Sequence, residues 1–169
     1  TGQTLISGMG ELHLEIIRNR MERDFGLKIR VHKPRVTYRE TIERAVDHET
    51  VFERQAGGTA QFAAVKLRLE PFTGDVPVTI VNKLKPGTIP QEWERLILKM
   101  LNDEARGGGS VGYPLMHLKV TILDVRHREG ETTDVALQAA TAMAMRDALR
   151  EAGTVLLEPI MKLEVVTPN

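Results

Sequence analysis

Residues 54–70 read RQAGGTAQFAAVKLRLE and contain the strongest fold signal in the chain. In the second half of this stretch, apolar and charged residues alternate: Val65, Leu67 and Leu69 against Lys66, Arg68 and Glu70. A period of two is the pattern of a strand with one buried and one solvated face. The Gly57-Gly58 pair supplies the permissive backbone of a tight connection. The stretch therefore predicts a β-hairpin over residues 50–70.

The sequence around the hairpin predicts more strands and two helices. Apolar residues three or four positions apart predict helices over 91–105 and 132–152, and the second is rich in small alanines that permit close packing. Thr132, Thr133 and Asp134 are all competent to cap that second helix. Extended patterns predict strands over 35–46, 76–82, 114–125 and 157–168. The order indicates an α+β fold, with two helices covering one face of a mixed sheet.

A separate strand–helix–strand unit is expected before this body. Helical spacing of apolar residues predicts a helix over 11–25, closed by Gly26, between strands at 3–8 and 27–32. Pro34 then marks a boundary. Because the chain starts at Thr1 without methionine, we expect it to be a piece of a longer protein.

Composition excludes several classes of function. Lys plus Arg equals Asp plus Glu, at 23 each, so nucleic acid could bind only through a local patch. The absence of cysteine excludes disulfides and thiolate metal sites. No apolar run reaches the roughly 20 residues that a membrane helix needs, so we expect no membrane partner.

No catalytic or metal-binding motif stands out. SGMGELH (7–13) lacks the third glycine of a dinucleotide loop and the Lys-Ser/Thr of a phosphate loop. None of the 5 histidines forms HxxxH or HExxH, and neither Ser7 nor Ser110 lies in GxSxG. We therefore expect no catalytic residue and no metal, and a histidine-based hydrolase ranks last among the hypotheses.

Three polar loops are candidates for binding: RQAGGTAQ (54–61), KLKPG (83–87) and RHRE (126–129). Arg and Gln on a glycine-rich turn can hydrogen-bond RNA backbone or 2′-hydroxyl groups. Polar loop residues are more often simply solvated, and Asp124, Glu129 and Glu131 reduce the charge of the third loop. The residue patterns leave both interpretations open and favour a plain turn for 54–61.

Several stretches together resemble elongation factor G and its close relatives, in order and at family-like spacing. They are TGQTLISGMGELHLEII (1–17), KPRVTYRETI (33–42), RQAGGTAQ (54–61), GYPLMHLKVTILD (112–124) and LLEPIMKLEVVTP (156–168). The resemblance covers essentially the whole chain. It implies that residues 1–33 are the second half of a ferredoxin-like third domain and 156–169 the first strand of a fifth domain. Residues 34–155 would be the fourth domain, with the left-handed βαβ crossover of a small-subunit ribosomal protein's second domain.

The resemblance also implies a function. In the family the fourth domain is an arm whose tip enters the decoding region of the ribosome as tRNA and mRNA move. The implied partners are the ribosome, its rRNA and the tRNA–mRNA complex, in the cytoplasm. The GTPase domain, with its GTP and Mg²⁺, belongs to the parent protein, so this fragment is expected to be no enzyme and to hold no cofactor. The residues that match the contacting tip are Arg54, Gln55, Gly57, Gly58, His127 and Arg128, with Lys83 and Lys85 as auxiliary phosphate contacts.

Some residues depart from the family pattern near that tip. Arg128 stands where relatives keep a histidine, and His127 takes a tyrosine position. The chain could thus come from a divergent paralogue for ribosome recycling or protection, or be a docking module without translocase activity. The strands expected at both ends would expose unpaired edges, so we also expect them to pair with each other, to exchange with a second copy, or to be poorly ordered.

Overall fold

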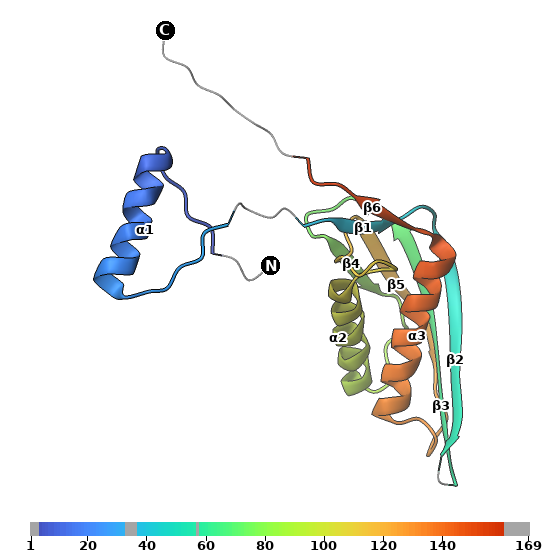
Figure 1. Cartoon of the computed structure of the whole chain (residues 1–169). Coiled ribbons are helices and arrows are strands. Elements are labelled where there is room, and N and C mark those ends of the chain that lie inside the picture. Colours follow the sequence, from blue (N-terminus) through green and yellow to red (C-terminus); the bar gives the residue numbers. More distant parts are fainter. Residues whose placement is uncertain (1–3, 33–36, 57, 161–169) are drawn as a thin grey trace. The chain divides into compact units, whose positions relative to one another are not determined.

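The computed structural model describes residues 4–32, 37–56 and 58–160. The chain divides into two compact units, Thr1–Thr37 and Tyr38–Asn169, which are described separately (Figure 1).

The first unit contains the predicted helix, α1 (Glu11–Phe25), which ends at Gly26 with φ 63 and its N–H bonded to the Met21 carbonyl. Residues 4–10 and 26–32 form no strand, in contrast to the prediction for 3–8 and 27–32. A helix satisfies its backbone groups within its own segment, whereas a strand needs a neighbouring strand. None of the residues of α1 is buried, so the helix is explained by its local sequence and not by packing against other elements.

The second unit holds the remaining elements. They are β1 (Arg39–Ile42), β2 (Val46–Ala56), β3 (Thr59–Pro71), β4 (Val78–Asn82), α2 (Gln91–Gly107), β5 (Leu118–Arg126), α3 (Asp134–Ala152) and β6 (Thr154–Leu157). Four strands form a sheet in the order β2-β3-β5-β4, antiparallel except for the parallel β4–β5 pair. β4, α2 and β5 therefore make a βαβ unit. The predicted hairpin is confirmed as β2–β3.

Both helices of the second unit lie on one face of this sheet (Figure 1). α3 packs on β2 and β3, while α2 packs on α3 and β4. Fully buried side chains such as Leu67, Ile97, Leu137 and Met145 fill the space between them. Several alanines of α3 are also fully buried, which lets the helix approach the sheet closely. The predicted α+β class, with helices on one face of a mixed sheet, is confirmed.

The predicted strand over 35–46 is divided in the structure. A bend at residues 43–44 separates β1 from β2, because the Glu43 and Arg44 amides donate to the carbonyls of Gly153 and Ala152. β1 pairs instead with β6, antiparallel, in a separate ribbon of two strands.

The last predicted strand, 157–168, is only partly within the described residues. Residues 158–160 form no strand, and 161–168 lie outside the described residues. A strand that was not predicted, β6, is separated from α3 by one residue and ends at Leu157. Exchange of terminal strands between two copies stays a prediction.

β5 contains a bulge, which changes the direction in which the side chains before the second loop point. Lys66 pairs with Asp124 but Leu67 pairs with Ile122, so Leu123 is an extra residue in the ladder. Such a bulge changes which side chains face the core beyond it. Val125 is buried, and Arg126 points to the open face of the sheet that no helix covers.

None of the described helices is both long and apolar enough to cross a lipid bilayer.

Candidate functional site

The β2–β3 hairpin projects from one end of the second unit (Figure 1). β5 pairs with β3 only as far as Ala64, so the β3 residues 59–63 extend about 16 Å beyond it at about 3.3 Å per residue. At the hairpin tip, residues 54–61, Arg54 faces Gln61 and Gln55 faces Ala60. The side chains of Arg54 and Gln55 are exposed.

A glycine connection closes the hairpin tip. Gly58 has φ 83, a backbone conformation that glycine adopts without strain. Gly57, the other predicted contact of this connection, lies outside the described residues.

The second loop, residues 127–133, is docked against the hairpin below that tip. The Thr132 hydroxyl donates to the Phe62 carbonyl at 2.6 Å and accepts from the Arg128 amide at 2.9 Å. The Phe62 amide donates to the Glu131 carbonyl at 3.1 Å. Of the three predicted capping residues it is Thr133 whose hydroxyl accepts from the Ala136 amide and caps α3.

Arg128 lies in the centre of the contact between the second loop and the hairpin. Its guanidinium carbon is 3.8 Å from the centroid of the Phe62 ring. Its Nη1 is 3.2 Å from Glu131 Oε2 and 3.1 Å from Glu53 Oε1. The hydrogen bonds to Glu131 and then Glu53 raise the pKa of Arg128 further above its ordinary value, so the group stays charged. Its positive charge already has two carboxylate partners within the chain.

His127 contacts a different element. Its ring meets Trp93 of α2 edge-on, with centroids 5.6 Å apart and an interplanar angle of 75°. The Trp93 indole donates to Asp134 Oδ1 at 2.9 Å. Trp93 therefore links the first turns of both helices to the second loop.

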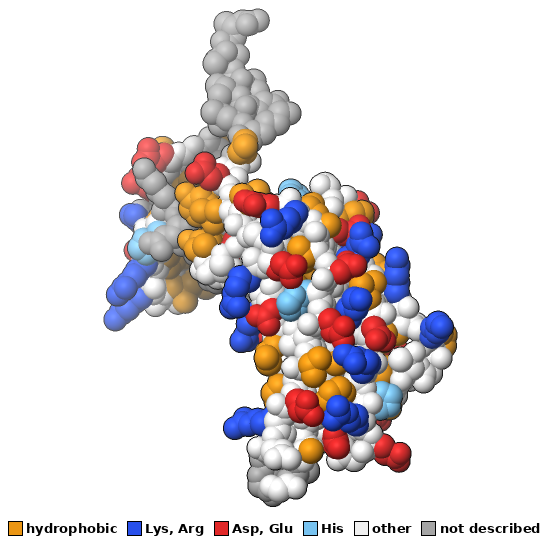
Figure 2. Space-filling view, turned by 90° about the vertical axis from the view of Figure 1, so that its right-hand side faces the viewer, with side chains coloured by type: hydrophobic (Ala, Val, Ile, Leu, Met, Phe, Trp, Pro, Cys, Tyr) orange, Lys and Arg blue, Asp and Glu red, His pale blue; other side chains and the backbone are white. Residues whose placement is uncertain are grey.

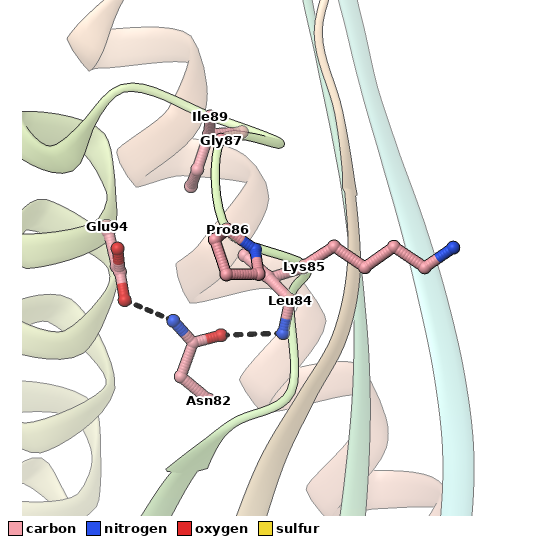
Figure 3. Close-up of a pocket in the computed structure, with 7 residues that line it drawn as sticks. All are labelled: Asn82, Leu84, Lys85, Pro86, Gly87, Ile89 and Glu94. Carbon is pink, nitrogen blue, oxygen red and sulfur yellow. Dashed lines mark hydrogen bonds between the residues drawn. The ribbon is translucent and has the colours of Figure 1, made fainter.

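The lysine loop, residues 83–90, surrounds a small polar pocket (Figure 3). Asn82 shapes it, because its side chain accepts from the Leu84 amide at 2.9 Å and donates to Glu94. The Lys85 side chain extends away from the pocket (Figure 3). These two hydrogen bonds of Asn82 hold the start of the loop in place, and Glu94 is already engaged by Asn82.

The two predicted lysines are set back from the hairpin tip. Asn82, just before them, pairs with Ile122, four residues before the end of β5. The pKa of Glu70 is lowered mainly by its hydrogen bond from Lys119, and the charge of Lys83 adds to this effect. Ile122 in turn pairs with Leu67, so the lysines follow a strand that ends level with the second half of β3 and not with the hairpin tip.

Ion pairs cover the open face of the sheet. Arg68 pairs with Asp47 and Glu70, Lys119 with Glu70, and Arg126 with Glu49. Figure 2 shows acidic and basic side chains interspersed over the displayed face. Mixed charge provides no broad field for nucleic acid, so any such contact depends on local groups.

Sequence reasoning missed the residues that support these loops: Glu53, Phe62, Asn82, Trp93 and Glu94. Asn82 had a recognisable signal, since asparagine at a strand end commonly bonds the backbone two residues on. The others come from elements distant in sequence, which no local pattern connects. Among the described residues, no cluster of three or more histidine or acidic side chains could hold a metal ion.

Comparison with known proteins identifies relatives over most of the chain. The family model "Elongation factor G, domain IV" matches residues 34–153, and "Elongation Factor G, domain III" matches residues 1–33. A protein of Thermus thermophilus, known from a crystal structure, superposes with a TM-score of 0.72 at 32% identity. The match covers 90% of this chain and 22% of that protein.

Proposed function

This chain belongs to the elongation factor G family, and from that premise we propose that it is the ribosome-binding arm of a translational GTPase. Its hairpin tip and second loop would enter the decoding region and promote movement of tRNA and mRNA. The arm itself would make or break no bond. GTP and Mg²⁺ would act in other parts of the parent protein, which would work in the cytoplasm.

The projecting hairpin is the observation that carries this proposal. It reaches about 16 Å beyond β5 and ends in the exposed side chains of Arg54 and Gln55. A narrow projection with few side chains can enter an RNA groove that a broad surface cannot. The opposite end of the sheet stays attached to the packed body formed by α2 and α3.

The proposed contacts follow from this geometry. Arg54 and Gln55 would bond phosphate or ribose oxygens, and the Gly57-Gly58 connection would let the backbone approach RNA closely. His127 would contribute from the second loop. Lys83 and Lys85, set back from the hairpin tip, would act as auxiliary phosphate contacts. Arg128 could reach a phosphate only by leaving Glu53 and Glu131.

The domain limits 1–33, 34–155 and 156–169 are part of the same proposal, and the last segment lies mostly outside the described residues.

Arg128 also favours a second candidate function. The family resemblance aligns this position with a histidine, whereas here a guanidinium is held between two carboxylates. An arm with such a tip could serve ribosome recycling or protection, or could dock on the ribosome without translocating.

Footprinting tests the proposal. The full chain is bound to purified small ribosomal subunits, and protection of rRNA from hydroxyl radicals is mapped. Protection of decoding-region nucleotides is expected, and protection confined to other sites would favour the docking alternative. No saturable binding at all would refute both.

A charge variant tests the contact residue. Arg54→Gln should weaken binding and reduce the slope of log K against log salt by about one. Arg106→Gln, which removes an exposed charge near the last turn of α2, is the matched control and should leave that slope unchanged.

A further inference from the structure

The projecting part of the hairpin has little support of its own. A ribbon of two strands is marginally stable in water without a further strand or a packed face. β3 residues 59–63 have no partner on β5 in the described register. Yet Phe62, in this segment, is only 6% exposed. Something other than the sheet must cover it.

The cover is the second loop, and Arg128 is its central side chain. The guanidinium lies over the Phe62 ring while Nη1 bonds Glu53 and Glu131. Glu53 is the cross-strand partner of Phe62, and Glu131 lies three residues further along the loop. One side chain thus joins β2, β3 and the second loop.

Few other side chains could make these contacts together. A guanidinium is planar, so it can stack on an aromatic face and still donate in its own plane. A lysine ammonium is a compact charge without a planar group, so it would keep only some of the contacts with Phe62, Glu53 and Glu131. The same two carboxylates would repel a phosphate that approached Arg128 closely.

We propose that Arg128 is a positioning residue, which locks the second loop onto the hairpin so that both meet RNA as one rigid surface. This inference rests on the proposed ribosome-binding function and reassigns one predicted RNA contact. Arg54, Gln55 and His127 would contact RNA. Arg128 would hold the hairpin and the second loop in the arrangement that these contacts need.

Amide hydrogen exchange, measured on the full chain, tests whether Arg128 holds the second loop on the hairpin. The Glu131 and Thr132 amides bond the Arg128 carbonyl at 3.2 and 3.0 Å, and the Phe62 amide bonds Glu131. Arg128→Met should accelerate exchange at these amides about fivefold, the scale of an exposed ion pair plus a cation–π contact. Arg128→Lys should restore only part of the protection. The double variant Glu53→Gln/Glu131→Gln should also accelerate exchange, although it keeps the arginine.

Arg126→Met is the matched control. Arg126 is about as exposed as Arg128 and pairs with Glu49 on the same face, opposite Ala64, without a bond to the second loop among the described contacts. It should leave exchange at the three amides unchanged. The single tryptophan, Trp93, contacts His127 and provides a second signal. Its emission should shift in Arg128→Met and not in Arg126→Met.

Binding to small ribosomal subunits separates positioning from contact. Arg128→Met should lower affinity with little change in the salt slope, because no phosphate contact is removed. A slope reduced by about one would assign Arg128 to phosphate and overturn the inference. Unchanged amide exchange in Arg128→Met would overturn it equally. Failure of Arg54→Gln to change the slope would instead count against the proposed contact by Arg54.

Discussion

Thr132 and Phe62 lie seventy residues apart in sequence and are joined by a 2.6 Å hydrogen bond from the Thr132 hydroxyl to the Phe62 carbonyl. The Phe62 amide donates to the adjacent Glu131 carbonyl. The second loop therefore satisfies the backbone of β3 just where β5 has ended. The second loop thus replaces the missing strand partner at Phe62 and supports the hairpin next to its tip.

Thr132→Val should test that support. Valine has nearly the same shape but lacks the hydroxyl that serves both Phe62 and Arg128. We expect a loss of about 1–2 kcal/mol in the free energy of unfolding, because two backbone groups lose their partner. Urea denaturation measures it. Thr73→Val, at an exposed threonine, is the control, and an equal loss there would contradict the assignment.

Glu40→Gln should destabilise the end of the domain opposite the hairpin tip. Glu40 is fully buried and accepts from the Tyr113 amide at 2.7 Å and the Val111 amide at 3.3 Å. An amide keeps only one acceptor, so the free energy of unfolding should fall by about 1.5–3 kcal/mol. Denaturation in urea checks this value. Glu92→Gln, on exposed helix surface, should have little effect.

Gly109→Ala should also destabilise the chain, because it would crowd the Glu40 carboxylate. A Cβ at this position would overlap Glu40 Oε2. Because Glu40 is fixed by the amides it accepts from, it cannot easily withdraw. We expect a lower melting temperature than for the parent chain. Gly107→Ala, where a Cβ would meet no atom within 4 Å, is the matched control.

Glu70 should give the folded chain a pH-dependent stability. The hydrogen bond from Lys119, 2.9 Å long, lowers the pKa of Glu70 below its ordinary value. The contribution is therefore full above the unfolded pKa of about 4.3 and is lost as pH falls through the lower folded value. Thermal unfolding of Glu70→Gln should depend less on pH below about 4.5 than that of the parent chain. Identical pH profiles would contradict this expectation.

Trp93 and Asp134 should be energetically coupled. Their 2.9 Å hydrogen bond joins the first turns of α2 and α3. A double-mutant cycle of Trp93→Phe and Asp134→Ala should give a coupling of about 1 kcal/mol. Strict additivity of the two single changes would show that the bond contributes nothing to stability.

Local sequence predicted the elements better than their limits. Alternation and the Gly57-Gly58 pair predicted the hairpin, and helical spacing predicted α2 from the residue at which it begins, Gln91. The break between β1 and β2 was not predictable, because it depends on bonds from Glu43 and Arg44 to the end of α3. The extra residue at Leu123 depends likewise on the register of a neighbouring strand.

The candidate site shows the same division. The polar loops could be found from residue type, and the family resemblance assigned them a role. The acidic residues near Arg128 were expected only to reduce its loop's charge, whereas Glu131 and the distant Glu53 bind its guanidinium directly. Sequence distance hid Phe62 and Trp93 as the surfaces on which Arg128 and His127 lie.

The sequence by itself determined the α+β class, the hairpin, the main helices and the membership of the elongation factor G family, because periodicity, caps and motifs are local properties of a chain. The tertiary structure alone decided which charges are free at the hairpin tip. That decision depends on long-range packing, which brings Glu53, Phe62 and Glu131 around Arg128 and leaves Arg54 exposed at the end of the hairpin.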